Sequence, residues 1–235
     1  MADKNQLLER YKIPQEILNT VKQTFDKTAK KLPSRNAIHK YTTNAFALGD
    51  SPDSFMIPFV MRELYLENSF VAYSDEFMTA LKNFCHANGI SSVAEVLCGT
   101  GWLSHWMKKY KIPVKHSVDN KSWPRYEGRQ YMRHVKRMDA VKHVKRCRSV
   151  ELFVMSWPYM DPVAANVWKA MRPGSYLLYI GEDRGGCTAD DEFFDLVGEH
   201  EVTDDTYETG FLDKMKESFV TFWGIHDEPR LFLKK

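Results

Sequence analysis

The chain has 235 residues, of which 43% are hydrophobic and 27% are charged, and its formal net charge is +2. This length is sufficient for one large α/β domain with its own core, and the composition is that of an ordinary globular protein. No apolar run approaches the roughly 18 residues of a membrane helix, and the first residues lack the apolar stretch of a signal peptide. The four cysteines have no Cys-x-x-Cys spacing, so we expect a cytoplasmic protein without a disulfide framework or a zinc cluster.

Apolar residues with helical spacing predict a helix over residues 5–31, broken at Pro14, and helix again over residues 55–84, where Ser74 or Asp75 can cap the second part. From residue 93 onward, short apolar runs alternate with amphipathic segments, which is typical of parallel β-α-β units. The predicted strands are residues 93–97, 114–118, 131–135, 150–155, 176–180, 219–223 and 231–233. No helix separates the last two predicted strands, which indicates that the sheet ends in an antiparallel pair.

These elements predict an α/β fold with a doubly wound, Rossmann-like sheet, mostly parallel with an antiparallel last strand. We expect this domain to occupy residues 89–235. Residues 1–88 are expected to form a helical N-terminal extension.

The first strand-to-helix joint reads AEVLCGTGWLS, and its Gly99 and Gly101 permit a sharp turn. In a doubly wound sheet this turn faces the crevice where nucleotides bind. The second predicted strand runs into Asp119, an acid placed to bind the two hydroxyls of an adenosine ribose. The third run leads to Asp139 and Ala140, from which a carboxylate or an amide can meet the edge of an adenine ring. An aspartate after a strand is also a common helix cap, so both interpretations of Asp139 stay open.

Two further groups follow strands on the same rim. The segment Ser156-Trp157-Pro158-Tyr159 follows the fourth strand, either as a stacking platform for a flat substrate or as a hydrophobic lid on the core. Glu182 follows the fifth strand and is either a base or substrate-orienting acceptor, or an ordinary loop acid. The eight histidines show no paired spacing, so no metal site is predicted.

Together these motifs resemble those of class I S-adenosylmethionine-dependent methyltransferases. The segment that begins at Glu95 is similar to their acid-x-Gly-x-Gly-x-Gly motif, with Leu97 in place of the first glycine. The resemblance covers roughly residues 90–235 and implies S-adenosylmethionine as the cofactor. The residues that it assigns to the cofactor are Glu95, Leu97, Cys98, Gly99, Gly101, Trp102, Asp119, Asn120, Asp139 and Ala140. A closer likeness, to methyltransferase-like chains with a Ser-Trp-Pro-Pro-Tyr and a Gly-Gly-Cys-Thr segment, implies no substrate.

The segment after the fourth strand resembles the (Asp/Asn/Ser)-Pro-Pro-aromatic motif of family members that methylate amino groups. Trp157 stands at the first proline position. The resemblance implies that Ser156 and the Trp157 carbonyl hold the amine, and that the ring of Tyr159 or Trp157 stacks on it. The expected function is therefore methyl transfer to an amino nitrogen, with Ser156, Trp157, Pro158, Tyr159 and Glu182 at the catalytic site.

Two alternatives stay open. One is a nicotinamide-dinucleotide enzyme, for which Ser104 is small enough to replace the third glycine, although that fingerprint gives Glu95 no role. The other is a protein that binds S-adenosylmethionine or a nucleotide without turnover. Basic side chains concentrate in residues 125–148, which could follow phosphates or form a solvated helix face, whereas residues 182–217 beside the acceptor side are acidic. A small-molecule or protein acceptor is therefore expected rather than duplex DNA.

Overall fold

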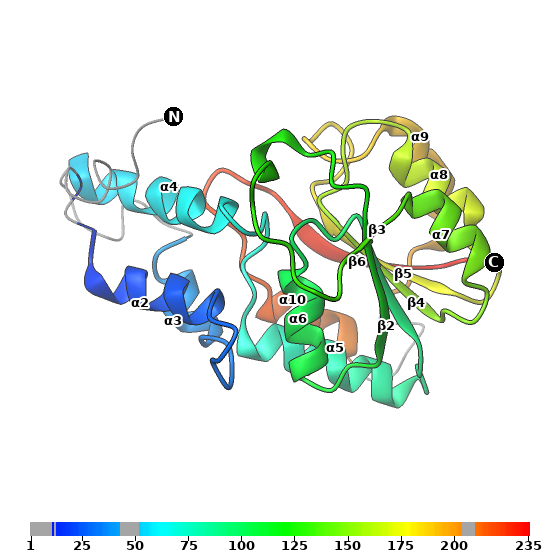
Figure 1. Cartoon of the computed structure of the whole chain (residues 1–235), viewed down its shortest axis with the longest axis horizontal. Coiled ribbons are helices and arrows are strands. Elements are labelled where there is room, and N and C mark those ends of the chain that lie inside the picture. Colours follow the sequence, from blue (N-terminus) through cyan, green and yellow to red (C-terminus); the bar gives the residue numbers. More distant parts are fainter. Residues whose placement is uncertain (1–10, 12, 43–51, 204–209) are drawn as a thin grey trace.

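The computed structural model describes residue 11 and residues 13–42, 52–203 and 210–235 (Figure 1). The strands in this part of the chain form one sheet in the order β3-β2-β1-β4-β5-β6. The first five strands pair in parallel, and β6 runs antiparallel to β5. Their bounds are β1 Val93–Val96, β2 Val114–Asp119, β3 Lys136–Arg137, β4 Leu152–Ser156, β5 Tyr176–Gly181 and β6 Glu228–Leu233. The predicted fold class, including the antiparallel last strand, is confirmed.

Helices cover both faces of the sheet (Figure 1). One layer contains α5 (Asp75–Ala87), α6 (Trp102–Lys109) and α10 (Phe211–Ser218), and the opposite layer contains α7 (Ala140–Arg146), α8 (Val163–Ala170) and α9 (Asp191–Val197). Three helices, α2 (Gln15–Thr24), α3 (Arg35–His39) and α4 (Pro52–Leu66), lie together at one end of the molecule. Two short 3₁₀ helices, η2 (Pro124–Tyr126) and η3 (Gly198–His200), complete the described elements. None of these helices has the length and apolar character needed to cross a membrane.

Helix α5 belongs to the core of the sheet although it precedes the first strand. Its buried Phe77, Leu81 and Phe84 are in the same apolar cluster as Val93 of β1 and Leu152 of β4. The Ser74 hydroxyl caps this helix by accepting a hydrogen bond from the Phe77 backbone N–H, as predicted. The boundary at residue 88 therefore falls between two elements that share one core, and the division of the chain into a helical extension and a sheet domain at that residue stays a prediction.

The third strand was predicted too early in the chain. Residues 131–135 form turns, and only Lys136 and Arg137 pair with β2. The apolar side chains of Met132 and Val135 are instead buried against the turn between β1 and α6, and the Met132 N–H donates to the Thr100 carbonyl at 2.9 Å. Packing against that turn competes with strand pairing in this segment.

The prediction of a strand over residues 219–223 was wrong. This segment follows α10 and makes an isolated bridge between Val220 and Ala72, just before α5. Val220 and Phe222 are buried in the apolar cluster of α2 and α4, whereas Phe219 packs with α5. The side chains are thus buried as in a strand, but they join the N-terminal helices to the sheet domain instead of extending the sheet.

Candidate active site

The turn between β1 and α6 has the backbone shape of a glycine-rich loop. Leu97, Gly99 and Gly101 have φ angles of 56°, 52° and 89°. A Cβ atom on Gly101 would lie 2.3 Å from a methyl carbon of Val135, so only glycine fits there. Leu97 adopts the left-handed conformation despite its side chain, which costs about 1–2 kcal/mol. The residue at the first glycine position of the motif therefore keeps the glycine conformation and places a leucine side chain at the site.

Asp119 ends β2 beside this turn and is only 9% exposed. One carboxylate oxygen accepts the Gly99 N–H at 2.9 Å, and the other accepts the Lys121 N–H at 2.6 Å. Burial raises the pKa of this carboxyl above its ordinary value, although the two N–H groups oppose the shift. Because each carboxylate oxygen can accept a second hydrogen bond, Asp119 can hold the turn and a ligand together. The Asn120 side chain instead accepts from Ser122 in an exposed turn.

Glu95 lies beneath the turn and is 2% exposed. Its carboxyl accepts the Ser104 N–H of α6 at 2.9 Å. Burial raises the pKa of Glu95 to about 8, and this carboxyl is therefore protonated at neutral pH when no cation lies beside it. It lines a small cavity of about 40 Å³, which Cys98, Gly99 and Trp102 also line.

Asp139 and Ala140 follow β3 at the same edge of the sheet. Asp139 is exposed and caps α7 by accepting the Lys142 N–H at 2.8 Å, and Ala140 is the buried first residue of that helix. Neither residue lines the cavity that contains Asp119. Asp139 is therefore a helix cap in this structure, and its contact with an adenine ring stays a prediction.

The segment that follows β4 contains polar groups with and without a hydrogen-bond partner. The Ser156 hydroxyl and the Trp157 carbonyl receive no hydrogen bond from the residues that the structure describes. Trp157 has a φ of 49°, and its indole N–H donates to the buried Asp227 at 2.9 Å. The hydrogen bond to Asp227 thus fixes the indole ring of Trp157, whereas the Ser156 hydroxyl and the Trp157 carbonyl are available to a ligand.

Aromatic rings surround this segment. Phe70, from the loop between α4 and α5, stacks on Trp157 with 5.3 Å between ring centroids and 20° between planes. Trp123, which follows β2, packs against Tyr159 at 5.3 Å and 39°. Flat, apolar surfaces of this kind bind planar groups by stacking.

Three of the predicted donor residues, Leu97, Gly99 and Asp119, line one cavity of about 390 Å³ together with the predicted acceptor segment 156–159. This volume is within the range of about 300–1,000 Å³ that is usual for small-molecule sites. The cavity adjoins the smaller one above Glu95, because Phe70, Leu97, Gly99 and Ser156 line both. Its lining comprises Phe70, Leu97, Gly99, Asp119, Trp123, Ser156, Trp157, Pro158, Tyr159, Met160 and Cys187.

Glu182 is close to this cavity but is not among the residues that line it. Its carboxylate accepts the backbone N–H groups of Cys187 at 2.7 Å and His226 at 3.1 Å. Burial alone would raise the pKa of Glu182, but these N–H groups outweigh it and hold the pKa below the ordinary value. Glu182 thus joins the loop after β5 to the segment before β6, and its role as a base stays a prediction.

We expect Glu182→Gln to lower the free energy of unfolding at neutral pH by about 1.5–3 kcal/mol, because a charge-assisted pair of hydrogen bonds is replaced by a neutral one. A depressed pKa stabilises the fold above the unfolded pKa, near 4.5, and this stabilisation is lost as the pH falls through the folded pKa. Urea unfolding of the wild type and of Glu182→Gln, measured from pH 7 to pH 3, should therefore show that their difference in free energy of unfolding becomes smaller as the pH falls. Glu192→Gln, which removes an exposed ion pair with Lys169, should change stability by less than about 1 kcal/mol; an equal effect in both variants would contradict the assigned role of Glu182.

The residues missed in the sequence include three that contact Trp157 or Tyr159. Phe70 comes from the segment NSFVAYS before α5, Trp123 from a second Trp-Pro pair after β2, and Asp227 from the segment before β6. The Trp-Pro pair after a strand was a usable signal, because the same pair follows β4. Nothing in the local sequence marks Phe70 or Asp227 as a neighbour of Trp157.

No protein-family profile matches the chain, and no curated protein matches it. Solved structures match at low identity. A SAM-dependent methyltransferase from Archaeoglobus fulgidus is 14% identical, with 67% of this chain and 94% of that chain covered and a TM-score of 0.39. TehB from Haemophilus influenzae is 13% identical, with 67% and 62% covered and a TM-score of 0.39. The O-methyltransferase TomG from Streptomyces achromogenes is 11% identical, with 70% and 82% covered and a TM-score of 0.38. The fold class rests on the strand order and not on these distant likenesses.

Proposed function

We propose that this chain is an S-adenosylmethionine-dependent methyltransferase that transfers a methyl group to an amino nitrogen. One observation carries the proposal: Gly99 and Asp119, from the donor motifs, line the same cavity as Ser156 and Tyr159, from the acceptor motif. A group-transfer enzyme needs both reactants in one enclosed space, because holding them in contact supplies much of the rate.

The charges around the cavity favour a cationic ligand. Among the described residues that line the two adjoining cavities, the carboxylic acids are Asp119 and Glu95, and neither lysine nor arginine contributes. S-adenosylmethionine carries a sulfonium and an ammonium group, which the Asp119 carboxylate attracts. A nicotinamide dinucleotide carries an anionic pyrophosphate, which the same carboxylate repels. The electrostatics therefore support the methyl donor over the dinucleotide.

Asp119 and the turn hold the donor in this proposal. The free lone pairs of the Asp119 carboxylate accept the two ribose hydroxyls, and the backbone at Gly99 lets the ligand approach closely. Glu95 lies toward the smaller cavity, where a cationic group would lower its pKa and favour its ionised form. When bound, S-adenosylmethionine supplies an electrophilic methyl group on its sulfonium sulfur.

Ser156 and Trp157 position the acceptor. The Ser156 hydroxyl and the Trp157 carbonyl accept hydrogen bonds from the amine N–H groups, which directs the nitrogen lone pair toward the cavity that holds the donor. The ring of Tyr159 stacks on the planar group that carries the amine. The surrounding rings exclude water, which strengthens each of these polar contacts.

The proposal is tested by titrating the purified chain with S-adenosylmethionine, S-adenosylhomocysteine and NAD in a calorimeter. We expect both adenosyl compounds to bind and NAD to give no heat of binding. Donor with a radiolabelled methyl group is then offered to pools of small amines, proteins, RNA and duplex DNA, and label is expected in small amines or proteins. Binding of NAD without binding of either adenosyl compound would refute the assignment.

Tyr159→Ala should reduce turnover by about tenfold to a hundredfold, since stacking on an aromatic ring is worth about 1–3 kcal/mol. Donor affinity should stay within about twofold, because Asp119 and the glycine turn hold the donor. Initial rates in the acceptor pool that takes up label, with donor affinity from calorimetry, measure the two effects separately. Tyr159→Phe is the matched control, because it keeps the ring and removes only the hydroxyl that bonds to Ser122. Equal loss of turnover in both variants would assign the effect to the hydroxyl and not to stacking.

A binding protein without turnover is the second candidate. Leu97 and Trp157 are the two positions that depart from the methyltransferase motifs, and both are non-glycine residues at positive φ in the cavity wall. Strained residues of this kind are retained where a site requires them. Tight binding of the donor with no label in any acceptor pool would favour this candidate over the enzyme.

A further inference from the structure

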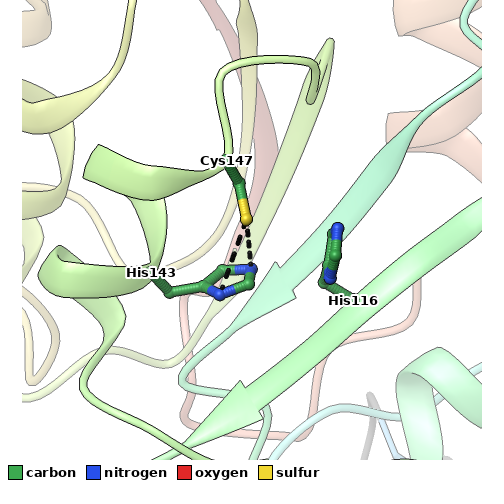
Figure 2. Close-up of side chains that lie close together, drawn as sticks. All are labelled: His116, His143 and Cys147. Carbon is green, nitrogen blue, oxygen red and sulfur yellow. Dashed lines mark hydrogen bonds between the residues drawn. The ribbon is translucent and has the colours of Figure 1, made fainter.

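Three side chains with metal-binding atoms converge between β2 and α7, on the face of the sheet that α7 covers (Figure 2). His116 comes from β2, and His143 and Cys147 lie one helical turn apart on and just after α7. Their ligand atoms all lie within 4.8 Å of one another. Residue spacing did not predict this group, because His116 is far from the other two residues in the chain and joins them only through the packing of α7 on β2.

The spacing of these atoms is close to that of a tetrahedral zinc site. The Cys147 sulfur lies 3.4 Å from Nε2 and 3.7 Å from Nδ1 of His143, and the rings of His116 and His143 are 4.9 Å apart at their centroids. With Zn–S of about 2.3 Å and Zn–N of about 2.0–2.1 Å, tetrahedral ligands lie about 3.4–3.6 Å apart. A rotation of the imidazole rings about their Cβ–Cγ bonds, to aim one nitrogen of each at the ion, completes the fit.

The chemistry of the group also suits zinc. Two imidazoles and one thiol supply nitrogen and sulfur donor atoms, and these bind a metal ion as neutral imidazole and thiolate. A thiolate and two imidazoles form a ligand set that zinc prefers, with solvent at the fourth position. His143 is buried, while His116 and Cys147 are partly exposed, so an ion can reach the group from solvent.

We propose that His116, His143 and Cys147 bind a zinc ion that fastens α7 to β2. Binding forms one Zn–S bond and two Zn–N bonds, and the thiol proton of Cys147 is released to solvent. The consequence is structural, because β2 ends at Asp119 and α7 begins directly after Asp139. The ion would therefore fix the position of α7 relative to β2, whose last residue, Asp119, lines the cavity of the candidate active site.

One charge opposes the ion. The exposed ammonium group of Lys136, on β3, lies within electrostatic reach of both histidines. A cation bound between them would be repelled by the same charge. Lys136→Gln should therefore tighten zinc binding, whereas loss of a ligand should weaken it.

The experiment uses the full chain without an affinity tag, freed of metal with a chelator and kept reduced with a phosphine. Zinc titration should give one ion per chain, with release of about one proton, measured from the dependence of the binding heat on the buffer. Cobalt(II) in place of zinc should give a sulfur-to-cobalt charge-transfer band and the visible bands of a tetrahedral ion. Zinc should raise the melting temperature of the wild type.

Cys147→Ser and His116→Asn should each weaken zinc binding by more than about a hundredfold, because losing even an outer partner of a metal ligand costs about 10–100-fold. The matched controls are Cys187→Ser and His86→Asn, which alter an exposed cysteine and an exposed histidine elsewhere and should leave zinc affinity unchanged. Met138→Leu tests for copper(I), because the Met138 sulfur lies 3.3 Å from His143 and a thioether favours that ion. Unchanged zinc affinity in Cys147→Ser, or the absence of a charge-transfer band in the wild type with cobalt(II), would overturn the proposal. If copper(I) binds more tightly than zinc and Met138→Leu abolishes that preference, the ion of this site is copper(I) and not zinc.

Discussion

Asp119→Ala should weaken the binding of S-adenosylmethionine by about a hundredfold or more. In the proposed complex, the substitution removes the acceptor of hydrogen bonds from two ribose hydroxyls, each bond worth about 1.5–3 kcal/mol because the acceptor is charged. It also leaves the N–H groups of Gly99 and Lys121 without their carboxylate acceptor, so the turn that faces the donor loosens. The combined loss of at least about 3 kcal/mol corresponds to a hundredfold or more in affinity. Calorimetric titration with S-adenosylmethionine measures it.

Asp139→Asn is the control for this prediction. It alters the acid at the end of the neighbouring strand, and asparagine caps a helix about as well as aspartate. Donor affinity should therefore change by less than about threefold if Asp139 only caps α7. Unchanged affinity in Asp119→Ala would place the donor elsewhere, and a large loss in Asp139→Asn would restore the adenine contact.

Trp157→Ala should lower the free energy of unfolding by about 3–5 kcal/mol, the usual cost of removing a packed aromatic side chain. The ring stacks on Phe70 and packs against the core, and its N–H donates to Asp227. Burial raises the pKa of the Asp227 carboxyl, so removing a donor from it adds to the cost. Urea unfolding and melting temperature measure the change, and Tyr159→Ala should change stability much less.

Two matched variants separate the causes. Trp157→Phe keeps a ring against Phe70 and removes only the bond to Asp227, so it should cost about 1–3 kcal/mol. Trp157→Gly should be more stable than Trp157→Ala, because glycine adopts the φ of 49° without strain. A Trp157→Ala variant within about 1 kcal/mol of the wild type would show that the ring serves ligands alone.

The sheet and its glycine turn were predictable because their signals are local. Buried parallel strands read as short apolar runs, and Gly99 and Gly101 mark the turn that follows the first of them. Residues 131–135 and 219–223 carry the same apolar signal, yet they are buried against the glycine turn and the N-terminal helices instead of pairing. Apolar content predicted their burial correctly, but the competing partners were set by tertiary packing.

The part of the site that lies at the ends of the strands was predictable, and the part that other segments contribute was not. Asp119 and Ser156 follow strands, and the carboxyl ends of parallel strands meet at one edge, so their proximity follows from the topology. Phe70 and Asp227 reach Trp157 from segments that the topology does not fix. The same holds for His116, His143 and Cys147, whose positions depend on the register with which α7 packs on β2.

The loop between α4 and α5 has a consequence for how this protein can change over time. Its Asn68 carbonyl accepts the Thr100 hydroxyl at 2.6 Å, and its Phe70 forms part of the cavity wall. Insertions or substitutions in this loop would alter the shape offered to a ligand while every motif residue on the sheet stayed the same. Descendants of this chain could therefore diverge in the molecules they accept and still be grouped together by their glycine turn and aromatic-proline segment.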